Sequence, residues 1–203
     1  MKKYILIGIS LLTLNSCSSD SDENNENIPI TTETVINKNI TNLFAGGPIG
    51  EDSPTIYFNL ETGLEVPASE ANTKNWDISF KRIEIRLNGG ISGPGNAAAV
   101  VITDQSYDGI ETAPEDGYIK DGEGPNDVSG LDLPNKLAFT NWFDYSNEQH
   151  SVLPKDQVYV IRTANNKYAK LEILSYYSES SPPISASYSF KYTLQPGGSK
   201  VLE

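Results

Sequence analysis

Apolar and polar positions follow the clearest pattern between residues 157 and 177, in the run QVYVIRTANNKYAKLEILSYY. Successive side chains of a strand point to opposite faces, so residues 158–163 would present apolar side chains on both faces of a sheet. Such a strand is expected inside a sheet rather than at its edge. The pair Asn165-Asn166 suits a tight turn, because asparagine tolerates a positive φ. The pattern therefore predicts a hairpin whose first strand is central.

The rest of the chain carries short runs rich in β-branched and aromatic residues, separated by clusters of Gly, Pro, Asn and Asp. No segment keeps an apolar period of 3.6 residues, so helices are not expected. The predicted strands are residues 33–39, 55–60, 76–87, 97–103, 137–145, 158–163, 168–177 and 187–195. This spacing predicts an all-β fold, with Trp76 first of all a packing residue of its core.

Residues 104–133 form the longest stretch without a strand pattern and are rich in aspartate and glycine. A loop of this length in a compact domain is usually functional or mobile. Its segment DGEGPND, residues 121–127, faintly resembles a calcium-binding loop. Pro125 stands where such a loop supplies an oxygen ligand, so calcium binding remains a minor alternative.

The first residues of the chain have the pattern of an export signal. Two lysines precede the apolar run of residues 4–14, which is well short of the roughly 20 residues needed to cross a bilayer. Residues 1–16 are therefore predicted to be a lipoprotein signal peptide, cleaved before Cys17, whose thiol is lipidated. The alternative is an incidental cysteine inside a plain signal peptide. Cys17 is the only cysteine in the chain, which excludes a disulfide and a cysteine metal site.

Residues 17–32 are predicted to be the lipidated cysteine and a disordered acidic tether, since residues 18–27 contain no apolar side chain. Residues 33–203 are predicted to form one domain. The formal net charge of −12 and the pI near 4.5 exclude nucleic acid as a partner, because phosphate binding needs a basic patch.

The sequence offers little support for catalysis. It contains no G-x-S-x-G or H-E-x-x-H motif, and its single histidine cannot build a multi-histidine metal site. We therefore expect a protein that is not an enzyme. A pair of carboxylates for glycoside hydrolysis stays open as an alternative, because acidic residues are abundant.

Four runs together resemble one known family. They are YFNLETGLEV at residues 57–66, NWDISFKRIEIRLNGGISGPGNAAAV at 75–100, YVIRTANNKYAKLEILSYY at 159–177 and SYSFKYTLQPGG at 187–198. The chain is similar here to the HmuY family of Bacteroidetes haem-binding lipoproteins. The resemblance implies a single all-β domain that acts as a haemophore, capturing haem and passing it to a TonB-dependent outer-membrane transporter.

The resemblance also bears on localisation. The acidic run that follows Cys17 resembles the surface-export signal of Bacteroidetes lipoproteins. It implies a lipid anchor in the outer membrane with the protein exposed at the cell surface. A solvated spacer with no addressing role is the alternative.

In the HmuY family the haem iron is held by two histidines, or in some relatives by methionines. This chain has only His150 and, in the leader, Met1. The family's second ligand falls near His150, and the first falls near Tyr118, which implies an imidazole and a tyrosinate as ligands of ferric iron. The alternative is that both residues are ordinary loop side chains. Trp142 and Tyr145 are expected to contact the macrocycle.

Two further expectations concern the ligand. The candidate partners of the haem propionates are Arg86, Lys120, Lys136 and Lys155. Two other functions stay open: binding of another porphyrin or planar apolar ligand without iron ligation, and a glycan-binding adhesion lipoprotein that stacks sugars on an exposed Trp142 and on tyrosines.

Overall fold

The computed structural model describes residues 34–46, 53–129, 131 and 136–203, and all of them belong to one compact unit. The strands are β1 (Ile36–Phe44), β2 (Ile56–Asn59), β3 (Leu64–Val66), β4 (Ile78–Lys81), β5 (Glu84–Leu87), β6 (Ala98–Ile102), β7 (Phe143–Ser146), β8 (Ser151–Pro154), β9 (Val158–Arg162), β10 (Tyr168–Tyr177) and β11 (Ser185–Gln195). A 3-10 turn, η1 (Ala68–Glu70), follows β3. The predicted all-β fold is confirmed.

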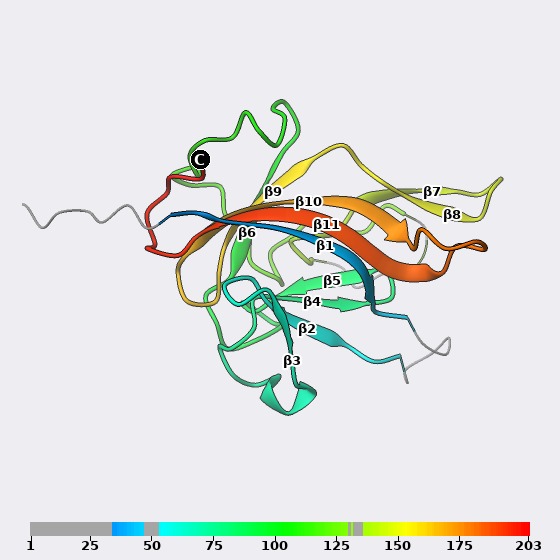
Figure 1. Ribbon diagram of the computed structural model, residues 1–203, viewed down its shortest axis with the longest axis horizontal. Coiled ribbons are helices and arrows are strands. Elements are labelled where there is room, and N and C mark those ends of the chain that lie inside the picture. Colours follow the sequence, from blue (N-terminus) through cyan, green and yellow to red (C-terminus); the bar gives the residue numbers. More distant parts are fainter. Residues whose placement is uncertain (1–33, 47–52, 130, 132–135) are drawn as a thin grey trace, which may run out of the picture. The chain divides into compact units, whose positions relative to one another are not determined.

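The strands form two main antiparallel sheets and one hairpin (Figure 1). The five-stranded sheet has the order β1-β11-β10-β9-β6, and the four-stranded sheet has the order β3-β2-β4-β5. Strands β7 and β8 pair only with each other. The predicted hairpin is β9–β10, and β9 pairs with β6 on its other side. The prediction of a central first strand is therefore confirmed.

The main core lies between the two sheets. Successive side chains of a strand point to opposite faces of its sheet, and the apolar faces of the two sheets pack against each other to form this core. The ring of Phe190 on β11 lies 5.7 Å from that of Phe58 on β2 and 5.4 Å from that of Phe80 on β4. Trp76 is a packing residue with 1% of its surface exposed, but it lies outside this core and packs against Tyr57 on the other face of the four-stranded sheet.

A second apolar cluster covers the opposite face of the five-stranded sheet. Val158 and Val160 of β9 pack there against Ile110, Ala113 and Leu202. These partners come from the long segment after β6 and from the C-terminal segment, which meet in one isolated bridge between Thr112 and Val201. Strand β9 is consequently buried on both faces, which explains its apolar sequence.

Three predicted strands had wrong bounds. The strand predicted over residues 33–39 is β1, which runs on to Phe44. The single strand predicted over residues 76–87 is two strands, β4 and β5, separated by a turn at Arg82, whose φ is 53°. The apolar side chains alternate at 76, 78 and 80 and then, after the polar pair Lys81-Arg82, at 83, 85 and 87, so this change of phase was a signal of the turn that the prediction overlooked. Strand β7 begins only at Phe143, because residues 137–142 form turns. The short strands β3 and β8 were not predicted, since three or four residues are too few for a pattern.

The leader, Cys17 and the tether lie outside the described residues. Among the residues that are described, no helix is long and apolar enough to cross a membrane.

Candidate ligand site

An open hollow of about 380 Å³ lies where β1 ends and β11 begins. It is lined by Asn42, Phe44, Ser178, Ser180, Ile184 and Ser187. The side chains of Phe44 and Ile184 are half exposed, at 52% and 51%. A hollow within the usual range of roughly 300–1,000 Å³, with apolar walls and a few polar groups, has the general form of a small-molecule site.

Local hydrogen bonds hold the loop that forms one wall of the hollow. The backbone N–H of Ser178 donates to the carbonyl of Ile184 at 2.9 Å, and the N–H of Ile184 donates to the Ser178 hydroxyl at 2.8 Å. The hydroxyl of Ser180 donates to the carbonyl of Pro182 at 2.9 Å. Because polar groups within the loop satisfy one another, Ile184 can remain exposed without unfolding the loop.

The opposite wall comes from the end of β1. The register between β1 and β11 shifts between Ile40 and Leu43, and Asn42 adopts a left-handed backbone with φ of 55°. Such a bulge turns the strand locally and re-aims the side chains that follow it. It leaves Phe44 beside Ser187, its register partner on β11.

The β7–β8 hairpin carries His150 to the same end of the five-stranded sheet. His150 is exposed in the turn of this hairpin and has a φ of 49°. The N–H of Val152 donates to the hydroxyl of Tyr177 at 3.0 Å, which ties β8 to the last residue of β10. Ser178 of the hollow follows directly. In Figure 1 the turn of β7–β8 and the loop between β10 and β11 lie at one end of the sheet, on the right.

Tyr118 lies at the other end of β10. Its ring packs 6.0 Å from that of Tyr168, the first residue of β10, and the guanidinium of Arg162 lies 5.6 Å from the ring centre. β10 has ten residues, so its ends are roughly 30 Å apart at about 3.3 Å per residue. Tyr118 belongs to the outer cluster, whereas the hairpin of His150 packs on the main core. In this conformation Tyr118 and His150 cannot hold the same iron, and the predicted pair is not formed.

The surroundings of Tyr118 also disfavour a tyrosinate. Its hydroxyl is buried and has no hydrogen-bond partner among the described residues. Burial raises the pKa of the Tyr118 phenol well above its usual value, which favours the neutral form. The side chain therefore acts here as a packing residue of the outer cluster.

Trp142 and Tyr145 have different positions. Trp142 is 2% exposed, and its indole N–H donates to the carbonyl of Ile83 at 2.9 Å. The prediction of an exposed Trp142 is wrong, because the dense apolar run around it packs into the core. Tyr145 is half buried on β7, opposite Val152 of β8. The structure thus brings Tyr145 and His150 to one hairpin.

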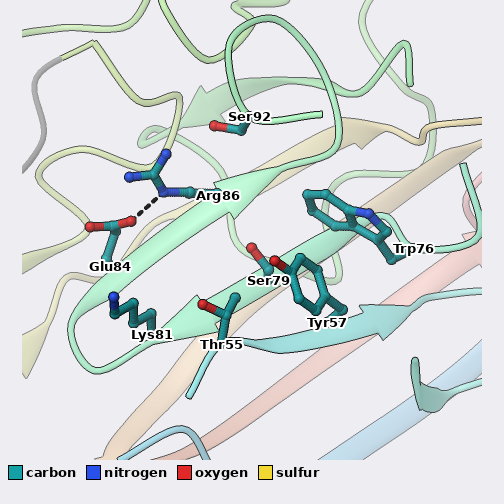
Figure 2. A pocket seen from close by; sticks show the side chains of 8 residues that line it. All are labelled: Thr55, Tyr57, Trp76, Ser79, Lys81, Glu84, Arg86 and Ser92. Atoms are coloured by element: carbon teal, nitrogen blue, oxygen red, sulfur yellow. Dashed lines mark hydrogen bonds and ion pairs between the residues drawn. The ribbon is translucent and has the colours of Figure 1, made fainter. Parts of the chain in front are cut away.

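The candidate propionate partners are scattered. Lys155 follows β8, at the end of the hairpin away from His150, and its ammonium lies 3.4 Å from the Asp144 carboxylate. Arg86 lies on the four-stranded sheet, in a second hollow, where it pairs with Glu84 (Figure 2). Neither residue lines the hollow beside Phe44 and Ile184.

The described residues contain no group of three His, Cys, Asp or Glu that could hold a metal ion. In the segment that resembled a calcium loop, the buried carboxylate of Asp121 accepts the N–H groups of Leu87 at 2.9 Å and Ala138 at 2.8 Å. This carboxylate therefore ties together two segments of the chain and does not face a cation.

Sequence reasoning missed Phe44 and Ile184. Ile184 is the one apolar residue between the serines and prolines of SSPPIS, residues 180–185. A lone apolar side chain in a polar loop was a signal that could have been read as a contact residue. Phe44 was missed because the first strand was predicted to end at residue 39, whereas β1 runs on to Phe44.

A family model described as "HmuY protein" matches residues 51–192. The chain is also similar to solved structures of the apo HmuY analog of Tannerella forsythia (18% identity, TM-score 0.56, 82% of this chain and 99% of that chain) and of apo PinO from Porphyromonas gingivitis (16%, 0.54, 82% and 100%). A third, described as an HmuY-like heme binding protein from Bacteroides vulgatus, has 13% identity and a TM-score of 0.52 over 78% of this chain and 90% of that chain.

No curated protein sequence matches the chain. At these identities the solved structures establish the shared fold. Because the family model spans most of the chain, from residue 51 to residue 192, the protein belongs to the HmuY family.

Proposed function

We propose that this protein is a haem-binding lipoprotein of the cell surface, which captures haem and passes it to a TonB-dependent transporter of the outer membrane. No reaction is catalysed. Family membership supports the proposal, as does the name of the similar Bacteroides vulgatus structure, an HmuY-like heme binding protein. The observation that carries it is the hollow beside Phe44 and Ile184, at the end of the sheet that also bears His150.

The residues of this end fit the chemistry of haem. The exposed side chains of Phe44 and Ile184 offer apolar contact to a macrocycle, and the exposed side-chain amide of Asn42 offers a hydrogen bond to a propionate. The imidazole of His150 would be the one axial ligand that the chain supplies to iron. Haem bound there would carry the iron, and the protein would contribute binding and orientation.

The lipid anchor is part of the proposal. Cys17 follows a leader with two lysines and an apolar run, and it precedes an acidic stretch. Acyl chains on Cys17 would hold the protein at the outer membrane, because each buried methylene contributes about 0.8 kcal/mol.

The second candidate is a porphyrin carrier that does not ligate iron. The distance between Tyr118 and His150 favours this second candidate. Of the two iron ligands that the family resemblance implies, at most one can then lie at the same site. In that case apolar contact with Phe44 and Ile184 would account for the whole affinity.

Titration with ferric haem and with metal-free protoporphyrin tests both candidates. For His150→Ala we expect a shifted Soret band and weaker haem binding, with unchanged binding of the metal-free ring. Phe44→Ala should weaken the binding of both haem and metal-free protoporphyrin, because it removes apolar contact with the ring and leaves the iron ligand in place. Tyr118→Phe is the matched control and should change neither titration.

Each result has a clear meaning. If the spectra of His150→Ala and wild type agree while both porphyrins bind, the protein is a porphyrin carrier without iron ligation. If neither porphyrin binds saturably to the wild type, the proposed function is wrong.

A further inference from the structure

The four-stranded sheet carries a second hollow, of about 260 Å³, on the face turned away from the core. Its lining residues are Thr55, Tyr57, Trp76, Ser79, Lys81, Glu84, Arg86 and Ser92 (Figure 2). Along β4 and β5 they alternate with residues that face the main core, such as Phe80 and Ile85, and Ser79 among them is only 2% exposed. The hollow is therefore a feature of the outer face of the sheet.

Strand register places its polar side chains in rows. Tyr57 of β2 is opposite Ser79 of β4, which is opposite Arg86 of β5. In the next row, Lys81 is opposite Glu84. Residues held on paired strands keep their mutual positions better than residues on loops. The hollow is thus a preformed arrangement of donors and acceptors.

Both signs of charge are present in the hollow. The guanidinium of Arg86 is paired with the carboxylate of Glu84, and the side chain of Glu84 is 17% exposed. Arginine and lysine only donate hydrogen bonds, an ionised glutamate only accepts them, and hydroxyls do both. The hydroxyls of Thr55 and Ser79 complete the set. A bound ligand would have to present donors and acceptors side by side.

Two aromatic rings close one side. The rings of Tyr57 and Trp76 meet edge to face with centroids 4.9 Å apart, and the indole N–H of Trp76 donates to the carbonyl of Ala71 at 3.0 Å. Trp76 is 1% exposed and is fixed by this bond, so it supports the ring of Tyr57 from behind, and the partly exposed Tyr57 ring is the aromatic surface that a ligand can contact. Aromatic rings offer apolar contact to C–H groups as well as a polar edge.

We propose that this hollow binds one neutral sugar residue. Sugar hydroxyls both donate and accept, and the C–H face of a sugar ring suits an aromatic wall. A carboxylate or sulfate would meet Arg86 but would be repelled by Glu84. The volume lies below the roughly 300–1,000 Å³ of sites for drug-sized ligands, so a macrocycle does not fit. The proposal is independent of porphyrin binding, because the two hollows share no lining residue.

The hollow would bind a sugar without cleaving it. Glycoside hydrolysis uses a pair of carboxylates, and Glu84 is the only carboxylate among those lining residues that the structure describes.

The test is ligand-observed NMR on the folded protein with the methyl glycosides of glucose, galactose, mannose and N-acetylglucosamine, and with sulfate as the anionic probe. At least one neutral glycoside should bind saturably. Glu84→Gln should weaken it about tenfold or more, because an ionised acceptor is lost. Ser79→Ala, which leaves the ion pair in place, should weaken it less. Glu65→Gln, an exposed glutamate on the neighbouring strand β3, is the matched control and should not change binding.

Two outcomes would overturn the proposal. One is the absence of saturable binding by every neutral glycoside at tens of millimolar. The other is tighter ligand binding by Glu84→Gln together with binding of sulfate, which would make the hollow an anion site. Glu84→Gln should bind haem as wild type does. A negative result for sugar binding therefore does not contradict the proposal of porphyrin binding.

Discussion

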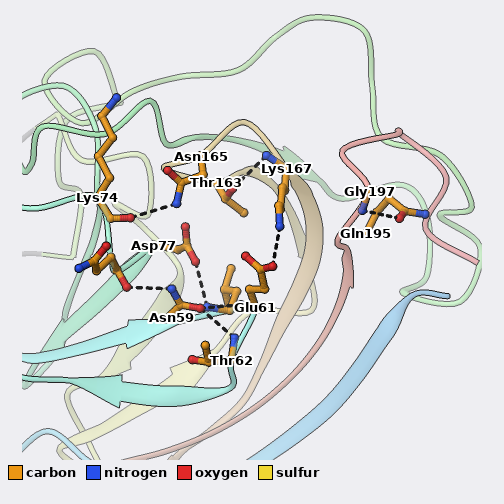
Figure 3. A network of polar contacts seen from close by, with 12 residues as sticks. Asn59, Glu61, Thr62, Lys74, Asp77, Thr163, Asn165, Lys167, Gln195 and Gly197 are labelled. Carbon is orange, nitrogen blue, oxygen red and sulfur yellow. Dashed lines mark hydrogen bonds and ion pairs between the residues drawn. The ribbon is translucent and has the colours of Figure 1, made fainter. Parts of the chain in front are cut away.

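Replacing Asp77 tests how the two sheets are held together. Asp77 is 3% exposed, and its two carboxylate oxygens accept the N–H of Leu60 at 2.9 Å and the N–H of Ala164 at 3.0 Å. Leu60 follows β2 of the four-stranded sheet, and Ala164 lies in the turn between β9 and β10 of the five-stranded sheet. Figure 3 shows Asp77 between these two turns. One buried side chain therefore links segments that are far apart in the sequence.

The expected cost follows from the groups that are left unpaired. Asp77→Ala leaves two buried N–H donors without an acceptor, at about 1–3 kcal/mol each, so the free energy of unfolding should fall by about 2–6 kcal/mol. Asp77→Asn keeps one acceptor oxygen and should cost about 1–3 kcal/mol. The loss of a desolvated charge offsets part of either cost, which favours the lower half of each range.

The cost should also depend on pH. Burial raises the pKa of the Asp77 carboxyl above its ordinary value of 3.8. The folded state then holds this proton more tightly than the unfolded chain does. The contribution of Asp77 to stability is therefore largest below about pH 4 and declines as the pH rises through the folded pKa. Asp77→Asn should cost more at about pH 4 than at about pH 7.

Urea unfolding followed by far-UV circular dichroism measures both effects. Asp156→Asn, an exposed aspartate, is the control and should change the free energy of unfolding by less than about 0.5 kcal/mol. An Asp77→Ala cost of the same small size, or a larger Asp77→Asn cost at about pH 7 than at about pH 4, would refute the reasoning.

Three further predictions concern the core, the tyrosines and the anchor. Ile161→Ala should cost about 2–5 kcal/mol in urea unfolding, because Ile161 is fully buried in β9, whereas Leu174→Ala, at a half-exposed position, should cost less; equal costs would contradict this. Burial raises the pKa of Tyr107 and of Tyr176 to about 12. Unfolded phenols ionise near pH 10, so the free energy of unfolding should fall as the pH rises from about 10 to about 12, with tyrosinate absorbance growing in step with unfolding; a gradual rise in absorbance before unfolding would argue against it. Cys17→Ser should yield a folded protein that no longer partitions with membranes in fractionation, and its retention in the membrane fraction would exclude the lipid anchor.

Much of the sheet could be predicted from local pattern. The β9–β10 hairpin was visible because alternation, β-branched residues and the Asn165-Asn166 turn all agree there. The division of residues 76–87 into two strands was missed, because the turn uses Arg82 rather than a glycine or proline and its only signal is the shift of the apolar positions from 76, 78 and 80 to 83, 85 and 87. Asp77 and Asp121 gave no sign of their roles, since a buried carboxylate and a surface carboxylate are the same letter in the sequence.

The site was harder to predict than the fold. The resemblance to the HmuY family made His150 a candidate ligand and implied that Tyr118 would lie beside it. The chain between Tyr118 and His150 does not run straight from one to the other, and the two residues end at opposite ends of β10. The hollow beside Phe44 and Ile184 joins segments some 140 positions apart, which no local pattern can bring together.

The sequence by itself determined the all-β class, the central β9 strand and the lack of a second histidine. Each of these depends on local alternation or on composition, which short-range sterics and residue counts decide. Only the tertiary structure decided which face of the five-stranded sheet each loop covers, and hence which side chains share a hollow. Those positions depend on contacts between distant segments, where burial, desolvation and strand register act together.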